Sequence, residues 1–243
     1  SLSMLALTMA ERDAEDVLFW LQRAKDNQSF DRSLWAHCLV ELAEAHMEPS
    51  SAARRIAAIY GLSSEKDLTY IQALSAFTAF RLREIMPREQ VLYYLEQVIE
   101  AARRLKIKHR EARALLYLWA LSPESTESHR WAQRALELVR EHGLDFLLTD
   151  DPHLEGLSLA RWALQRGVEA GYLLHIWPRW GERGMEALME LFPSLPLEIK
   201  RKVVKLWEGM GYGPARPLLL QEGERAADAS LRRLCRGAIR ALD

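Results

Sequence analysis

Residues 94–121, YLEQVIEAARRLKIKHREARALLYLWAL, decide the fold. The stretch divides into two segments with helical spacing of apolar residues, joined by a short basic turn. The first segment extends backwards, because the apolar residues of 87–105 fall at offsets 0, 4, 7, 11 and 14 on one helix face. The stretch therefore predicts an antiparallel helical hairpin in which each helix buries one apolar face.

The same spacing continues outward through the rest of the chain. It recurs in 127–142, in 199–210 and in 231–242. No segment alternates apolar and polar residues between hairpin turns, so we expect no strand. The sequence predicts an all-α protein of about thirteen helices, each of roughly 10–20 residues, with loops of about 2–6 residues.

Glycine and proline are distributed unevenly. Residues 1–142 contain one glycine, Gly61, and the remaining residues contain the other eleven. Because glycine frees the backbone and proline removes an N–H group, we expect long helices first and shorter helices with tight turns after a change near 143–152.

Three polar or proline signals predict helix starts. Ser64 followed by Asp67 has the spacing of a capping box. Pro87 and Pro152 suit the first turn of a helix, and Asp151 is placed to cap the second of these.

The hairpin of 94–121 resembles the tetratricopeptide repeat, in which a small residue in one helix lets the next hairpin pack closely. Ala101 and Ala102 stand at that position, and Ala135 follows Ala101 after 34 residues, the period of that family. The resemblance implies a right-handed α-α superhelix, a tetratricopeptide-like solenoid.

Residues 183–243 contain two copies of a helix, a turn and a helix with a basic face, and they resemble a pair of HEAT repeats. In that family an Asp caps the second helix and an Arg reaches a neighbouring repeat, which implies these roles for Asp228 and Arg232. In the first copy Glu198 and Lys200 stand near those positions, so this copy departs from the family pattern.

Residues 159–164, LARWAL, and 166–168, RGV, resemble the region that follows the tetratricopeptide array in large bacterial transcriptional regulators, the MalT-like and SARP-like activators. The order of segments then implies three parts. They are degenerate tetratricopeptide-like hairpins in 1–150, a linking helix pair in 151–181 and HEAT-like repeats in 182–243.

This resemblance implies a non-enzymatic sensor or protein-interaction region of a cytoplasmic transcriptional regulator, and hence a segment of a longer protein. A small-molecule effector or a partner protein would bind it, and DNA would be bound only by domains outside this chain. The chain has no G-x-x-x-x-G-K-[ST] loop and no separate helix-turn-helix. The alternative is a free-standing helical-repeat scaffold that mediates protein–protein interactions.

Composition excludes several other classes. Among 243 residues, 33 Lys and Arg nearly balance 34 Asp and Glu, so no global field favours nucleic acid. Two cysteines cannot form a disulfide framework, which indicates a reducing compartment. No run approaches the roughly 20 apolar residues of a membrane span, so we expect a cytoplasmic chain without a membrane partner. The oligomeric state stays open.

No segment has the residue spacing of a metal or catalytic site. The densest group, Asp150, Asp151 and His153, is explained by a helix start. Cys38 and Cys235 lie on apolar helix faces and are expected to be buried. We therefore expect no catalytic residue, no cofactor and no metal.

Two surfaces are candidates for binding. One is an aromatic and cationic patch that either lines a ligand pocket or fills the corner between the two repeat types: His175, Trp177, Arg179 and Trp180. The other is a basic surface formed by Lys200, Arg201, Lys205, Arg232, Arg236 and Arg240. It is read either as a site for phosphates or an acidic partner, or as a solvated face with an arginine ladder between repeats. The local excess of four positive charges in 195–243 is small, which favours the second reading.

Overall fold

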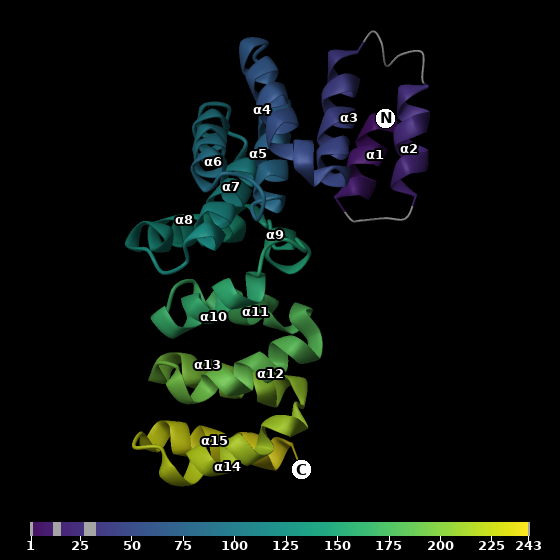
Figure 1. Ribbon diagram of the computed structural model, residues 1–243. Coiled ribbons are helices and arrows are strands. Elements are labelled where there is room, and N and C mark those ends of the chain that lie inside the picture. Colours follow the sequence, from purple (N-terminus) through teal and green to yellow (C-terminus); the bar gives the residue numbers. More distant parts are fainter. Residues whose placement is uncertain (1, 12–15, 27–32, 243) are drawn as a thin grey trace. The chain divides into compact units, whose positions relative to one another are not determined.

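The computed structural model describes residues 2–11, 16–26 and 33–242, which form helices and turns and contain no strand (Figure 1). The all-α prediction is confirmed. The chain divides into two compact units, residues 1–128 and 129–243. Within the described ranges, no helix is both long enough and apolar enough to cross a bilayer.

The first unit is built from helices that each pack against the next along the chain. They are α1 (Leu2–Ala10), α2 (Val17–Lys25), α3 (Leu34–Met47), α4 (Pro49–Glu65), α5 (Thr69–Arg81), α6 (Arg88–Arg104) and α7 (Lys108–Leu121), followed by α8 (Thr126–His142), which crosses into the second unit.

Stacked aromatic side chains tie the helices of the first unit together. Phe80 of α5 and Tyr117 of α7 are both fully buried, with ring centroids 3.8 Å apart and planes 11° from parallel. Tyr60 of α4 stacks on Tyr94 of α6 at 3.9 Å. In addition, α5 contacts both α3 and α7, so the hairpins share one core.

The predicted hairpin of 94–121 is present as α6 and α7. Between them Lys106 adopts a left-handed backbone, with φ of 59°, and the N–H group of Ile107 donates to the carbonyl of Ala102 at 2.8 Å. This hydrogen bond satisfies a carbonyl group at the end of α6, and the left-handed residue turns the chain back within three residues. Ala102 is buried in this hairpin.

The predicted capping box is wrong. Ser64 lies in the last turn of α4, and Asp67 sits in the following turn with φ of 51°. There the N–H group of Leu68 donates to the carbonyl of Ser63 at 2.8 Å, a helix-ending arrangement. The same small polar residues suit a helix end and a helix start, and only the packing of α4 decides between them. Pro87 directly precedes α6, close to its predicted place.

The second unit consists of shorter elements separated by turns. They are α9 (Phe146–Thr149), α10 (Gly156–Arg166), α11 (Ala170–Ile176), a 3-10 turn (Trp177–Trp180), α12 (Gly181–Leu191), α13 (Leu197–Met210), α14 (Arg216–Arg225) and α15 (Ala229–Ala241), with further 3-10 turns at Phe192–Ser194 and Gly213–Ala215.

Glycine and proline shape this unit as their distribution predicts, but two details differ. Helices α9 and α11 have four and seven residues, fewer than expected. Pro152 does not start a helix: it lies in a turn in which the carboxylate of Asp151 accepts from the N–H group of His153 at 3.0 Å. Helix α10 begins only at Gly156, whose missing side chain lets its backbone lie directly against the carbonyl of Leu148.

Candidate functional site

The predicted aromatic and cationic patch is split by the structure. Trp177 is fully buried, and its indole N–H donates to the carbonyl of Gly184 at 2.7 Å. Trp180 packs edge-on against Trp177 with ring centroids 5.3 Å apart, and a side chain at Gly184 would meet Trp180 at 2.6 Å. Trp177 therefore fills the core between α11 and α12, and Trp180 is half-buried at its edge.

The other two members of the patch, His175 and Arg179, are not part of this core. His175 is exposed on α11. Arg179 is held by an ion pair between its Nη1 and Oδ2 of Asp145, at 3.0 Å. Asp145 also accepts from the hydroxyl of Tyr172, and burial together with this bond raises the pKa of Tyr172. Arg179 thus anchors the 3-10 turn to the residues before α9.

Trp180 lines a cleft of about 470 Å³ between the turn that enters α10 and one side of α12. On α12, Arg183, Ala187 and Glu190 follow Trp180 along successive turns. Ser158 of α10 contributes to the opposite wall. The volume lies in the range of pockets that hold small ligands.

Charges of both signs line this cleft. Arg161 of α10 pairs with Glu190 of α12 across 3.2 Å, which links the two walls. Among the described residues, Arg183 and Glu186 form no ion pair, and both are exposed. The exposed guanidinium of Arg183 and the exposed carboxylate of Glu186 lie beside the indole of Trp180. Together they can bind a ligand that carries both a negative and a positive charge.

No known protein family, curated protein or solved structure matches this chain. The resemblance to tetratricopeptide, HEAT and regulator sequences therefore stays a prediction, and the site rests on its own geometry.

Two of the six residues of the predicted basic surface hold the last two hairpins together, and a third is engaged within its own hairpin. Lys200 of α13 pairs with Glu222 of α14 at 3.0 Å, and Arg201 pairs with Asp228 at 3.2 Å. Arg232 donates to carbonyls of the turn before its own helix, among them that of Ala227 at 3.0 Å.

The predicted cap at Asp228 is confirmed, but the role implied for Arg232 is wrong. Asp228 accepts from the N–H group of Leu231 at 2.7 Å, and hydrogen bonds from Ser230, Leu231 and Arg201 lower its pKa to about 2. The residues that reach between the copies are Lys200 and Arg201, both from the first copy. The resemblance implied a link from α15, whereas the structure shows these two links starting from α13.

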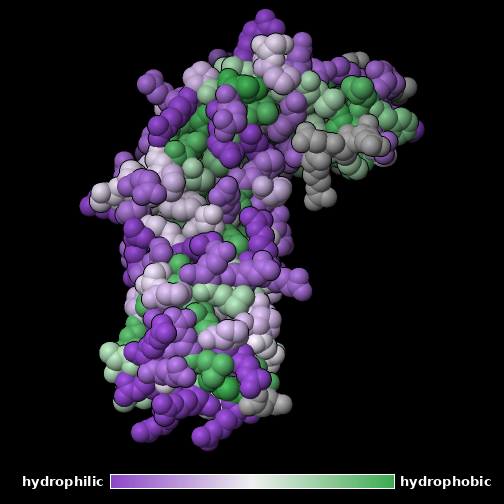
Figure 2. Space-filling view, turned by 60° about the horizontal axis from the view of Figure 1, so that its bottom comes forward, coloured by the Kyte–Doolittle hydropathy of each residue, from purple (hydrophilic) through white to green (hydrophobic). Residues whose placement is uncertain are grey.

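The other half of the basic surface, Lys205, Arg236 and Arg240, is exposed and forms no ion pair in the described part of the chain. Figure 2 shows hydrophilic side chains projecting over α14 and α15. Both cysteines are buried as predicted, and burial raises the pKa of Cys235 to about 11, which keeps it a thiol.

The sequence reasoning missed Arg183 and Glu186. These two residues belong to no recognisable sequence motif. The one feature of the sequence that could have indicated the cleft is the spacing of Trp180, Arg183 and Ala187 along one side of α12. That spacing is ordinary for a solvated helix face. Only the turn before α10, brought alongside by the Gly156 contact, makes it one wall of a cleft.

Proposed function

We propose that this chain is the non-enzymatic sensor region of a cytoplasmic transcriptional regulator and that an effector binds in the cleft beside Trp180. The cleft supports the proposal that an effector binds to this chain. The resemblance of residues 159–168 to large bacterial regulators supports the proposal that the chain belongs to a transcriptional regulator, in which domains outside this chain bind DNA. The proposal includes a right-handed superhelix, supported by the consecutive hairpins and the shared contacts of α3, α5 and α7.

The chemistry of the cleft selects a short peptide, free or as the end of a partner protein. Arg183 suits a carboxylate, and Glu186 suits an ammonium group. The exposed edge of Trp180 offers an apolar surface for a side chain between the two charges. Binding that favours one arrangement of α10 and α12 would then be passed to attached domains as a shift of population.

A panel of di- and tripeptides titrated into the intact chain tests this proposal by calorimetry. We expect saturable binding by some members of the panel. Arg183→Gln and Glu186→Gln should each weaken it about tenfold, because each leaves one ligand charge unpaired. Arg166→Gln is the matched control: this exposed arginine on α10 lies outside the cleft and should leave affinity unchanged.

Small-angle scattering supplies the second readout. At a peptide concentration near the Kd of the unaltered chain we expect a change in the scattering profile, and this change should be smaller for Arg183→Gln at the same concentration. A panel without any binder, or binding that is insensitive to both cleft variants, would contradict the sensor proposal.

A second candidate, the protein-interaction scaffold, is favoured by one observation in the first unit. Leu18 and Phe19 of α2 are 68% and 54% exposed, and Leu18 and Met47 line a groove beside Arg55. Exposed apolar side chains next to a groove are typical of protein contacts. A Leu18→Ser/Phe19→Ser variant that loses a partner in pull-downs, while peptide binding is absent, would support the scaffold over the sensor.

A further inference from the structure

Helices α3, α5 and α7 lie side by side, and their first turns gather aromatic and basic side chains. Trp35 of α3 stacks on Tyr70 of α5 with centroids 5.5 Å apart and planes 20° from parallel. The guanidinium of Arg110, in the first turn of α7, lies over the Tyr70 ring, 4.7 Å from its centroid. Lys106 and His109 precede Arg110 in the same turn region of the chain. We call these five residues the basic aromatic surface.

Positive charge is concentrated here. Residues 103–113 contain six Lys and Arg and a single acidic residue, Glu111. Glu111 is only 2% exposed and is already engaged by Arg103 at 2.9 Å and Lys108 at 3.3 Å. Its charge is therefore not available to the remaining cations.

The outer cations of this segment are not compensated. In the described part of the chain, Lys106 and Arg110 form no ion pair. Burial lowers the pKa of His109, and the nearby charges of Arg110 and Arg113 lower it further.

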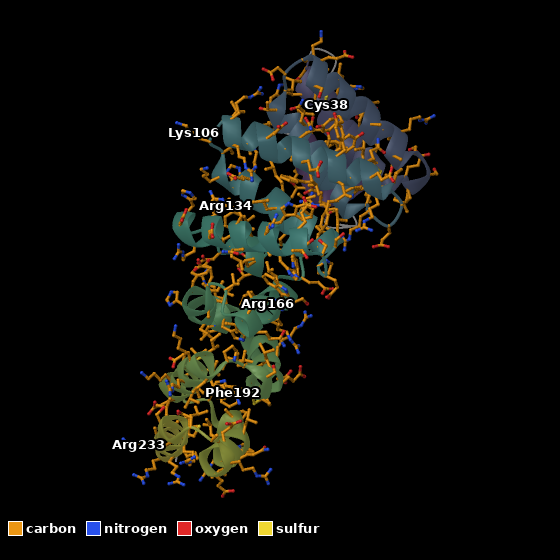
Figure 3. The ribbon with its side chains drawn as sticks, turned by 90° about the vertical axis from the view of Figure 1, so that its left-hand side faces the viewer. Cys38, Lys106, Arg134, Arg166, Phe192 and Arg233 are labelled. Carbon is orange, nitrogen blue, oxygen red and sulfur yellow. The ribbon has the colours of Figure 1, made fainter. Side chains whose placement is uncertain are left out.

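The surface is accessible. Trp35 is 42% exposed, and Lys106 and His109 are exposed, whereas Tyr70 and Arg110 are half-buried beneath them. Figure 3 shows Lys106 at the outer edge of the first unit, at the tip of the α6–α7 hairpin. The tight left-handed turn at Lys106 fixes the position of this tip.

We propose that the basic aromatic surface binds single-stranded nucleic acid. Uncompensated Lys and Arg attract backbone phosphates. An exposed indole already stacked on one side offers a planar surface to a base, and stacking on aromatic side chains is how proteins hold unpaired bases. A duplex keeps its bases within its own stack, and an acidic peptide would use the cations but not Trp35, so the combination selects a single strand.

This inference is independent of the effector cleft and of the DNA-binding domains expected outside the chain. The chain as a whole has a net charge of −1, so any attraction to a polyanion must be local. The exposed cations Lys202 and Arg233 of the second unit provide a matched control, because they lie outside both candidate sites and form no ion pair within the described residues.

The first test measures charge. Fluorescence anisotropy follows binding of a labelled, mixed-sequence single-stranded DNA of about 20 nucleotides, longer than the roughly 4–16 that one site covers. Lys106→Asn/Arg110→Gln should weaken binding about tenfold and lower the salt slope by about 1.4, since each phosphate contact contributes about 0.7. Asn tolerates the left-handed backbone at 106. Lys202→Gln/Arg233→Gln should change neither quantity.

The second test measures stacking. Trp35→Leu retains every charge and should weaken single-strand binding at least about fivefold, with the salt slope unchanged. The matching duplex should bind more weakly than the single strand to the unaltered chain. Circular dichroism checks that each variant is folded. If Trp35→Leu does not fold, the result for Lys106→Asn/Arg110→Gln decides whether this surface binds the single strand.

Four results would overturn the proposal. They are no binding of the single strand, equal binding of duplex and single strand, an equal loss in the Lys202/Arg233 control, and preferential binding of poly-glutamate or of vesicles rich in anionic lipid. The last would identify an acidic protein or a membrane surface as the occupant instead.

Discussion

The two units of this chain solve the same packing problem with different residues. In the first, helices of up to 17 residues are joined by large stacked rings, as at Phe80 and Tyr117. In the second, shorter helices approach one another at glycine, as at Gly156 and Gly184, and are linked by ion pairs such as that between Lys200 and Glu222.

The difference shows how helix length determines what a helix interface needs. A long helix presents several turns to its neighbour and can bury rings along them. A helix of seven to eleven residues, such as α10, α11 or α12, presents only two or three turns, so close backbone approach at glycine contributes a larger share. Eleven of the twelve glycines accordingly lie in the second unit.

The largest expected effect tests the aromatic interface. Phe80→Ala removes a fully buried ring stacked on Tyr117 and should lower the free energy of unfolding of the first unit by about 3–5 kcal/mol. Urea denaturation followed by circular dichroism measures this. Phe19→Ala, at an exposed ring, is the control and should cost about 0.5 kcal/mol or less. A loss below about 1 kcal/mol at Phe80 would mean that the rings do not hold this unit together.

A smaller effect tests the glycine contacts of the second unit. Gly156→Ala places a methyl group on the carbonyl of Leu148 and should cost about 2–3 kcal/mol, because backbone must move. Gly209→Ala is its counterpart in α13, where no atom lies within 4 Å of the added carbon. That change should stabilise the chain by about 0.5–1 kcal/mol. Thermal denaturation compares the two, and equal effects would contradict the role given to Gly156.

The smallest effect concerns charge and pH. The folded pKa of Asp228 is about 2 against an ordinary 3.8, so its carboxylate stabilises the fold above pH 3.8 and loses this contribution as the pH falls towards 2. Asp228→Asn keeps a capping oxygen and removes the charge. Its Tm should lie below that of the unaltered chain at neutral pH and converge with it near pH 2.

Glu111 gives the matching measurement in the first unit. Burial raises the pKa of its carboxyl, but hydrogen bonds from Arg103 and Lys108 outweigh this, and the net pKa is lowered from 4.5. The Tm difference of Glu111→Gln should therefore also be present above pH 4.5 and fade below it. A difference that grows on acidification in either variant would contradict the assigned ion pairs.

Parts of this fold could be predicted because they depend on local patterns. The hairpin of 94–121, the buried faces of Cys38 and Cys235, and the cap at Asp228 each follow from residues within a few turns of one another. The capping box at Ser64 failed for the same reason, since a local pattern cannot distinguish a helix start from a helix end. The cleft and the basic aromatic surface each combine segments that are distant in sequence.

The sequence by itself determined that the chain is helical and which helix faces are apolar, because helical periodicity is a property of consecutive residues. Tertiary structure alone decided that Trp177 is buried while Trp180 borders a cleft, that Arg201 links two hairpins, and that Trp35, Tyr70 and Arg110 form one stack. The physical reason is that side-chain contacts between helices depend on how each helix is rotated and shifted against its neighbour. Those quantities are set by the summed packing of the whole core.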